Sequence, residues 1–269
     1  MTDGHTGITP SADALADLAE ELAARAGALV MAMAVEARSR TATKSSATDL
    51  VTAADKAAEV AIVDGIDAVR PDDAIEGEEG TSRPGTTGVT WHVDPIDGTT
   101  NYVYNVPAFS VSIAAAIGDE VVAGAVFDPS LGRMYRAALG RGATVDGLPL
   151  RCTDKAELAT ALVATGFGYG ADRRRRQAEA LVELLPRIRD IRRFGSAALD
   201  LCAVAEGRVD AYYERGLNRW DLAAGALVAA EAGARVGNLD GGGADETFTL
   251  AAPPALFEPL AEVLRTAKA

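Results

Sequence analysis

The segment DPIDGTTNY, residues 94–102, constrains the fold of this chain more than any other feature of the sequence. It follows VTWHV at residues 89–93, whose β-branched and aromatic side chains predict a strand. Because proline has no backbone N–H to donate to a sheet, we expect this strand to end at Asp94. Asp97 and Gly98 would then turn the chain, and Thr99 would begin a helix.

Two interpretations of this segment are open. In the first, the carboxylates of Asp94 and Asp97 and the carbonyl of Ile96 converge at the end of a strand. The N–H groups of Gly98 and Thr99 would lie beside them at a helix N-terminus, where anions bind. Hard oxygen ligands next to such groups predict Mg²⁺ holding a phosphate. In the second interpretation, Asp-Gly is simply the turn of a hairpin.

Composition narrows the possible partners. The chain has 269 residues, of which 48% are hydrophobic and 24% charged, as is typical of a soluble globular protein. Its net charge of −13 argues against direct nucleic-acid binding. An acidic protein that acts on a phosphate needs local positive charge, and bound metal ions would supply it.

The cellular location is also constrained. Two distant cysteines, Cys152 and Cys202, form no disulfide framework and fit a reducing cytoplasm. The start, MTDGHTGITP, lacks the basic region of a secretory signal. The apolar run at residues 26–35 is too short to span a bilayer, so no membrane association is expected.

The order of elements indicates two halves. Ser11 is a predicted N-cap for a helix whose apolar face includes Leu15, Leu22 and Leu29, and a second helix is expected at 53–69. Strand patterns at 109–117, 121–127 and 133–139 predict a β-meander. Strands and helices then alternate: strands at 161–165, 209–213 and 235–236, and helices at 174–185, 196–206, 222–232 and 255–267. We therefore expect an N-terminal α+β domain at 1–148 and a C-terminal α/β domain at 149–269.

Three further acidic residues stand at the ends of predicted elements. Asp221 could be a helix N-cap, Asp55 a first-turn carboxylate that favours a helix, and Glu78 a solvated side chain. None of the three indicates a site by itself. Their order along the chain, together with the segment at 94–102, carries more information.

Taken in order, three motifs resemble those of the inositol monophosphatase family, which are Mg²⁺-dependent, Li⁺-sensitive phosphatases. They are GEEG at 77–80, DPIDGTTNY at 94–102 and WDLAAG at 220–225. The resemblance covers most of the chain, is strongest to the bacterial, actinobacterial-type branch, and also includes KSS at 44–46, the segment 49–55, GSAALD at 195–200, DAYYE at 210–214 and EAGA at 231–234. It implies an α/β (α+β) fold, a layered αβαβα sandwich of the inositol monophosphatase and fructose-1,6-bisphosphatase type. It places most metal ligands in the N-terminal half and the substrate contacts in the C-terminal half.

The resemblance implies two to three Mg²⁺ ions in each active site. The first would be held by Glu78, Asp94 and the carbonyl of Ile96, and the second by Asp94, Asp97 and Asp221. A third, weaker ion is expected near Glu78. Five carboxylates would repel one another if they packed together without metal: Asp55, Glu78, Asp94, Asp97 and Asp221. We therefore expect Mg²⁺ to stabilise the fold.

The resemblance also assigns catalytic and substrate-binding roles. Asp55, Glu78 and Thr99 would be catalytic, with Thr99 hydrogen-bonded to Asp55 and activating a metal-bound water. The substrate, a small phosphate monoester, would contact these residues: Asp97, Gly98, Thr99, Gly195, Ala197, Glu214 and Asp221. Lys44 is expected near the site, and the resemblance also implies a homodimer.

Other phosphatase chemistries fit the sequence less well. Cys202 and Arg208 have the C-x5-R spacing of cysteine phosphatases, but Cys202 lies in a helical pattern and is expected in the core. Haloacid-dehalogenase phosphatases need D-x-D, whereas two residues separate Asp94 from Asp97. The histidines, His5 and His92, give little support to a phosphohistidine route.

Two residue patterns depart from simple expectations. Glu76 stands where relatives usually carry an apolar residue, so either it faces solvent or it shifts the turn that carries Glu78. The run Arg173–Arg176 is interpreted mainly as the solvated first turn of a helix. Because arginines at a helix N-terminus oppose its dipole, attraction of a substrate phosphate or a partner surface stays open for this run.

The leading functional hypothesis is hydrolysis of myo-inositol-1-phosphate to inositol and phosphate. The nearest alternative is another phosphomonoesterase of the same fold, acting on histidinol phosphate, fructose-1,6-bisphosphate or adenosine-3′,5′-bisphosphate. Glu214 favours a neutral polyol, since a carboxylate accepts hydrogen bonds from hydroxyls and repels a second phosphate. A different class is an accessory role in transcription, for which the Arg173–Arg176 run is the supporting feature.

Overall fold

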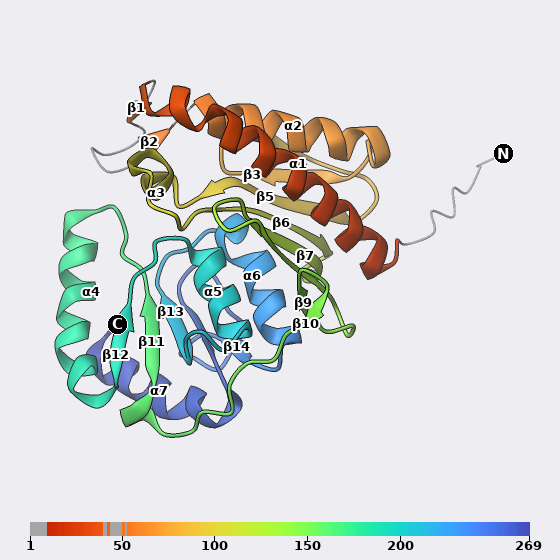
Figure 1. The fold of residues 1–269 in the computed structure, drawn as a ribbon. Helices are drawn as coiled ribbons and strands as arrows, with labels where there is room; N and C mark the ends of the chain where they lie inside the picture. Colours follow the sequence, from red (N-terminus) through yellow and green to blue (C-terminus); the bar gives the residue numbers. More distant parts are fainter. Residues whose placement is uncertain (1–9, 40–41, 44–49, 52) are drawn as a thin grey trace.

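The computed structural model describes residues 10–39, 42–43, 50–51 and 53–269, and arranges them in alternating layers of helix and sheet (Figure 1). The first sheet has eight strands in the order β10-β9-β8-β7-β6-β5-β3-β4. Its strands are β3 (Ala74–Gly77), β4 (Ser82–Arg83), β5 (Val89–Asp97), β6 (Ser110–Ile117), β7 (Glu120–Asp128), β8 (Arg133–Ala138), β9 (Ala143–Val145) and β10 (Leu148–Pro149). Helices α1 (Ala12–Ser39) and α2 (Ala53–Val69) cover its outer face, and β1 (Ala42–Thr43) pairs with β2 (Leu50–Val51) beside them (Figure 1).

The second sheet has five strands in the order β12-β11-β13-β15-β14. Its strands are β11 (Leu162–Thr165), β12 (Asp190–Arg192), β13 (Ala211–Glu214), β14 (Arg235–Gly237) and β15 (Thr249–Ala252). Helices α5 (Ala197–Ala205) and α6 (Arg219–Glu231) lie between the two sheets, whereas α4 (Ala171–Leu184) and α7 (Pro254–Ala267) form the outer layer (Figure 1). The expected αβαβα sandwich is therefore confirmed.

Apolar side chains fill each interface between the layers. Trp91 and Ile113 of the first sheet pack with α1 and α2, and Tyr135 on the opposite face packs with Cys202 of α5. Tyr212 and Leu201 belong to the cluster between the middle helices and the second sheet, and the cluster on the far face of that sheet includes Phe257. Within the described residues no helix is long and apolar enough to cross a lipid bilayer.

The middle layer approaches the first sheet unusually closely at one point. A Cβ atom added to Gly124 of β7 would lie 2.9 Å from the Cα of Ala224 in α6. Helix and strand therefore touch through backbone, and a glycine is required at this point of β7. The helix that carries Asp221 is seated directly on the sheet that carries Asp94.

The strand before the site is longer than expected. β5 runs through Pro95 to Asp97 instead of ending at Asp94. Its register with β6 shifts between Asp94, which pairs with Ser112, and Asp97, which pairs with Ser110. The extra residue forms a bulge, and a bulge tolerates a proline that cannot donate to the ladder.

Most of the other predicted elements are confirmed. Ser11 caps α1, accepting a hydrogen bond from the N–H of Ala14 at 3.2 Å, and α2 spans the predicted 53–69. The strands of the meander β6–β7–β8 and the later helices begin and end within three residues of their predicted limits. The sequence patterns did not predict β12 and β15, which have three and four residues, or β4, which has two.

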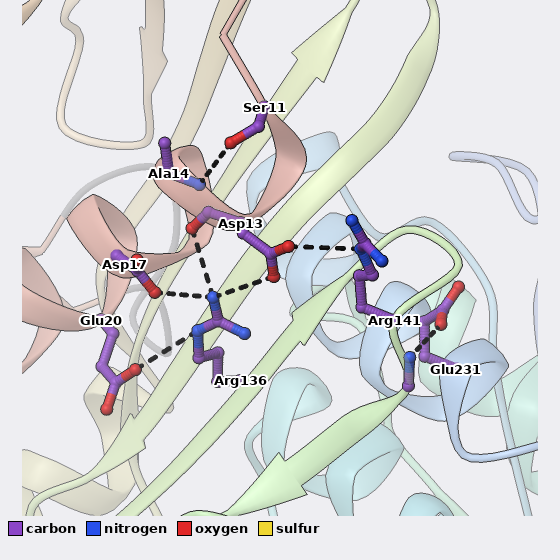
Figure 2. A network of polar contacts seen from close by, with 9 residues as sticks. Ser11, Asp13, Ala14, Asp17, Glu20, Arg136, Arg141 and Glu231 are labelled. Atoms are coloured by element: carbon purple, nitrogen blue, oxygen red, sulfur yellow. Dashed lines mark hydrogen bonds and ion pairs between the residues drawn. The ribbon is translucent and has the colours of Figure 1, made fainter.

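Charged groups join the outer helix to the first sheet (Figure 2). Arg136 of β8 contacts the carboxylates of Asp17 at 2.6 Å, Asp13 at 3.4 Å and Glu20 at 3.4 Å. At the C-terminal end of α6, Glu231 accepts hydrogen bonds from the N–H groups of Gly140 and Gly142 at 2.8 and 2.7 Å. Exposed pairs of this kind contribute about 1 kcal/mol or less each, so they orient elements more than they stabilise them.

Candidate active site

The predicted site residues converge on one cavity of about 390 Å³. It opens where the end of β5 meets the N-termini of α5 and α6 and the loops after β11 and β13. Its lining contains almost the whole predicted set: Glu78, Asp94, Ile96, Asp97, Gly98, Thr99, Gly195, Ala197, Glu214 and Asp221. Asp55 is fully buried in α2 and does not line the cavity, and Lys44 lies outside the described residues.

The bulge in β5 orients the carboxylate of Asp94 and the carbonyl oxygen of Ile96. The N–H of Ile96 donates to Oδ1 of Asp94 at 3.0 Å, which closes a local turn around Pro95. The hydroxyl of Thr99 donates to the carbonyl of Ile96 at 3.0 Å. This carbonyl keeps a second lone pair, so the bond does not prevent it from serving as a ligand. The predicted hydrogen bond between Asp55 and Thr99 stays a prediction.

Asp97 ties the first sheet to the middle layer. Its Oδ2 accepts hydrogen bonds from the hydroxyl of Ser196 at 2.6 Å and the N–H of Ala198 at 2.8 Å. Ser196 is also the N-cap of α5, since its hydroxyl accepts from the N–H of Leu199 at 3.2 Å. One carboxylate oxygen of Asp97 is thus fixed by a helix N-terminus, which leaves Oδ1 for a ligand.

Asp221 is oriented in a similar way, but it is not the N-cap. Asn218 is the N-cap of α6, and Asp221 is the third helical residue of a capping box. Its Oδ2 accepts from the N–H of Asn218 at 2.6 Å. The helix expected at 222–232 therefore begins at Arg219, because the capping residues lie upstream of the apolar pattern.

Crowding of acidic groups changes their protonation. Burial, with the nearby charges of Glu78, Asp97 and Asp221, raises the pKa of Asp94 well above its usual value. Burial, with the charges of Asp97 and Glu78, also raises the pKa of Asp221, and burial raises the pKa of Asp97 to about 6. The charges that act on Asp94 and Asp221 come from other carboxylates, so a bound cation would stabilise the ionised forms of both groups.

These residues fit Mg²⁺ by the chemistry of their donors. All the groups are hard oxygens, which Mg²⁺ prefers, and a cation would relieve the repulsion that raises their pKa values. No three carboxylates, thiols or imidazoles among the described residues already have the arrangement of a finished metal centre. Rotation of side chains would therefore accompany binding.

The other end of the cavity carries Glu214. Its Oε2 accepts a hydrogen bond from the hydroxyl of Tyr212 at 2.7 Å. Burial raises the pKa of Glu214 to about 7, against the lowering influence of Tyr212, Arg193 and Arg173. A Cβ on Gly166 would lie 1.8 Å from the same oxygen, so only glycine leaves room for this carboxylate.

Two arginines line the cavity near Glu214: Arg193, to which the sequence analysis gave no role, and Arg173, for whose run attraction of a substrate phosphate was left open. Arg193 precedes the loop to α5, and Arg173 lies in the first turn of α4. Added Cβ atoms at Gly168 and Gly216 would lie 2.2 Å from Cδ and 2.5 Å from a guanidinium nitrogen of Arg173. The Arg173 side chain therefore spans two glycines on facing loops. The solvated interpretation fits the other arginines of the run, which are exposed and do not line the cavity.

Backbone contacts hold the two halves of the cavity together. The side-chain amide of Asn101 donates to the carbonyls of Ala108 at 2.6 Å and Phe194 at 2.7 Å. Gly98, with φ +93°, lies so close to the second half that a Cβ atom would be 2.9 Å from the carbonyl oxygen of Gly195. Asn101 belongs to the opening motif, but its role depends on a residue distant in sequence and could not be read from the pattern.

The alternative chemistries find no support at this cavity. Cys202 is fully buried within α5, as expected of a core residue. Glu76 has a half-exposed side chain whose Oε2 lies 3.1 Å from Nδ1 of His92. Of its two expected positions, Glu76 therefore takes the one facing solvent, and neither residue lines the cavity.

Comparison with known proteins agrees with this geometry. The model of the inositol monophosphatase family matches residues 11–268. The inositol-1-monophosphatase SuhB of Mycobacterium tuberculosis is 46% identical over 93% of both chains. The Nus factor SuhB of Pasteurella multocida is 41% identical over 82% of this chain and 84% of its own. The solved structure of Mycobacterium tuberculosis SuhB superposes with a TM-score of 0.84 at 42% identity, covering 96% of this chain and 98% of that one. The chain belongs to the inositol monophosphatase family.

Proposed function

We propose that this protein is a Mg²⁺-dependent phosphomonoesterase that hydrolyses myo-inositol-1-phosphate to inositol and phosphate. The observation that carries the proposal is the shared cavity, in which Asp94, Asp97 and Asp221 face the same space as Glu214. One end of this cavity is suited to cations and the other to hydroxyl groups. The name of the Mycobacterium tuberculosis relative supports the choice of inositol-1-phosphate.

In this proposal the carboxylates hold two to three Mg²⁺ ions. Glu78, Asp94 and the carbonyl of Ile96 would bind the first ion, and Asp94, Asp97 and Asp221 the second. When bound, Mg²⁺ lowers the pKa of a coordinated water and neutralises charge on the phosphate during displacement. The hydrogen bonds to Asp94, Asp97 and Asp221 described above each fix one carboxylate oxygen, which leaves the other oxygen for this task.

The remaining residues bind and orient the substrate. The N–H groups of Gly98 and Thr99 would hold the phosphate. The Thr99 hydroxyl would orient the attacking water and pass its own proton to the carboxylate of Asp55 as it takes one from the water. Glu214 would accept hydrogen bonds from the alcohol, with the backbone of Gly195 and Ala197 on the facing wall. The volume of the cavity, about 390 Å³, suits a small polyol.

Phosphate release from a panel of substrates at fixed Mg²⁺ tests this function. The panel contains inositol-1-phosphate, histidinol phosphate, fructose-1,6-bisphosphate and adenosine-3′,5′-bisphosphate. We expect inositol-1-phosphate to give the highest kcat/KM, no turnover with EDTA, and inhibition by Li⁺. A higher kcat/KM for histidinol phosphate would overturn the assignment of the alcohol, and turnover in EDTA would overturn the metal-dependent chemistry.

A role in transcription is the second candidate, favoured by the relative named Nus factor SuhB. The exposed Arg174, Arg175 and Arg176 on α4 offer a basic surface for such a role. Pull-down with purified RNA polymerase and its elongation factors, using wild type and a variant with these arginines replaced by alanine, tests it. Capture that depends on the arginines and persists in Asp94→Asn would support this role, and absence of capture would reject it.

We also propose that the protein is a homodimer in the cytoplasm, as the family resemblance implies. Sedimentation velocity at micromolar concentration should give the mass of two chains. A single species of one chain, with full activity, would reject the dimer.

A further inference from the structure

Glu59 is a buried carboxylate whose hydrogen bonds all reach the turn that carries Glu78. It lies in α2 and is 4% exposed. Its Oε2 accepts from the N–H of Glu79 at 2.7 Å, and its Oε1 accepts from the N–H and the hydroxyl of Thr81 at 3.1 and 2.6 Å. A single side chain thus accepts three hydrogen bonds from the residues that follow Glu78.

The opposite side of the same turn is fixed to β5. The N–H of Glu78 donates to the carbonyl of Val93 at 3.1 Å, which places Glu78 beside Asp94 in the neighbouring strand. The turn is closed by a hydrogen bond from the N–H of Gly77 to the carbonyl of Thr81 at 2.7 Å. Glu78 is therefore held between a strand on one side and Glu59 on the other.

The chain makes room for this arrangement at Gly77. A Cβ atom added there would lie 2.5 Å from Oε2 of Glu59, closer than any side chain allows. The carboxylate therefore packs directly on the turn backbone. Asp55, which precedes Glu59 by four residues, is buried on the same face of α2, so this helix directs two carboxylates toward the cavity region.

We propose that Glu59 is a positioning residue for Glu78, and that its hydrogen bonds to the 77–81 turn set the affinity of the site for Mg²⁺. The inference rests on the proposed Mg²⁺ site, and adds a residue that does not itself line the cavity. Outer hydrogen-bond partners of metal ligands act in this way by reducing the number of orientations the ligand samples before binding. Loss of Glu59 would leave the turn free to move Glu78 away from Asp94.

Isothermal titration calorimetry with MgCl₂ on the full chain, without substrate, tests the proposal. Glu59→Ala should lower Mg²⁺ affinity about 10- to 100-fold, the range found when such outer partners are removed. Glu59→Gln keeps one carbonyl oxygen in the same shape and should recover part of the affinity. Thr81→Val removes only the hydroxyl bond to Oε1 and should weaken binding by about threefold.

Asp64→Ala is the matched control, because it removes an exposed acidic residue from the same helix without touching the turn. Its Mg²⁺ affinity should equal that of wild type. The melting temperature of each variant in EDTA separates positioning from folding, since a purely structural role would lower this temperature and leave the affinity of the folded protein unchanged.

The outcomes distinguish this inference from the proposed function. Wild-type Mg²⁺ binding with unchanged affinity in both Glu59→Gln and Thr81→Val would overturn the positioning role and leave the function intact, even if Glu59→Ala failed to fold. Absence of Mg²⁺ binding in the wild-type protein would overturn the metal-dependent function itself. An affinity loss in Asp64→Ala equal to that in Glu59→Ala would also reject the positioning role, since it would reflect charge alone.

Discussion

Two buried carboxyl groups lie at opposite ends of the parallel pair β3 and β5, and their pKa values are shifted in opposite directions. Asp73 directly precedes β3 and accepts hydrogen bonds from Arg70, from the hydroxyl of Thr87 at 2.6 Å and from the indole N–H of Trp91 at 2.9 Å. Burial alone would raise its pKa, but these donors lower it below the usual value. At the other end, the pKa of Asp94 is raised by burial and by its acidic neighbours.

Solvent exposure does not distinguish the two carboxyl groups, since Asp73 is 0% and Asp94 1% exposed. What distinguishes them is the supply of donors within the protein. Asp73 faces a guanidinium, a hydroxyl and an indole N–H, whereas Asp94 faces the carboxylates of Glu78, Asp97 and Asp221, as is expected of the metal ligand proposed here. The difference predicts where substitutions cost stability and where they cost activity.

The largest expected effect is at the cavity end. Asp221→Asn should lower kcat/KM for inositol-1-phosphate by on the order of a thousandfold. The amide oxygen can still accept from the N–H of Asn218, so the capping box and the melting temperature in EDTA should be retained. Steady-state kinetics and thermal melting of the same preparation measure both. Activity close to wild type would refute the assignment of Asp221 as a ligand.

The next effect is at the other end of the strand pair. Asp73→Asn should lower the free energy of unfolding by about 1 to 3 kcal/mol, because an amide N–H₂ replaces one carboxylate oxygen and leaves a buried donor of this cluster without its acceptor. Chemical denaturation in EDTA measures the loss. Mg²⁺ affinity of the folded variant should stay unchanged, and a parallel loss of affinity would show that the two ends are not independent.

A pH dependence sharpens the comparison. The folded pKa of Glu214, about 7, exceeds the usual 4.5, so its ionisation opposes folding as the pH rises from about 4.5 to 7. Glu214→Gln should therefore stabilise the metal-free protein by up to about 3 kcal/mol at pH 8 and by almost nothing at pH 4. Ionisation of Asp73 has the opposite effect on stability, because its folded pKa lies below the usual 3.8. The stabilisation that it contributes is present above pH 3.8 and is lost as the pH falls through the folded pKa.

Denaturation of wild type, Glu214→Gln and Asp73→Asn from about pH 2 to pH 8 measures both slopes. Equal stability of wild type and Glu214→Gln at pH 8 would show that Glu214 is not held against its ionisation.

The smallest effect concerns the arginine at the cavity. Arg173→Ala should change kcat/KM by about three- to tenfold, since an exposed side chain contributes about 1 kcal/mol. The change should be largest at pH above 7, where Glu214 is ionised and most affected by the guanidinium. Arg176→Ala on the same helix does not touch the cavity and should behave as wild type. Identical kinetics for the two variants would show that Arg173 does not contribute to turnover, although it lines the cavity.

Much of the fold could be predicted because it rests on local patterns. The limits of α2 were predicted correctly, and helix α3 (Thr99–Tyr104) begins at the predicted Thr99, directly after the turn at Asp97 and Gly98. The end of β5 was misplaced because Pro95 ends a regular strand, yet a bulge accommodates it. β12 was missed because its three residues, two of them charged and exposed, carry no apolar alternation.

Only some of the residues at the site could be predicted from the sequence. Motif residues such as Asp94, Asp97 and Asp221 could be assigned because their order along the chain is distinctive. Arg193, Ser196 and Glu59 could not, because each acts on a partner far away in sequence: Arg193 on Glu214, Ser196 on Asp97, and Glu59 on the 77–81 turn. In a sequence, a buried glutamate on an apolar helix face resembles a solvated one.

The close approach of Gly124 to Ala224 also limits which movements the inner layers allow. Because α6 and β7 meet through backbone atoms, no change of side-chain rotamer can absorb a shift of the helix toward the sheet. The outer helices pack through side chains, which can repack when a residue changes in size. The spacing between the sheet that carries Asp94 and the helix that carries Asp221 is therefore set by the backbone, whereas the orientation of the two carboxylates is left to their side chains.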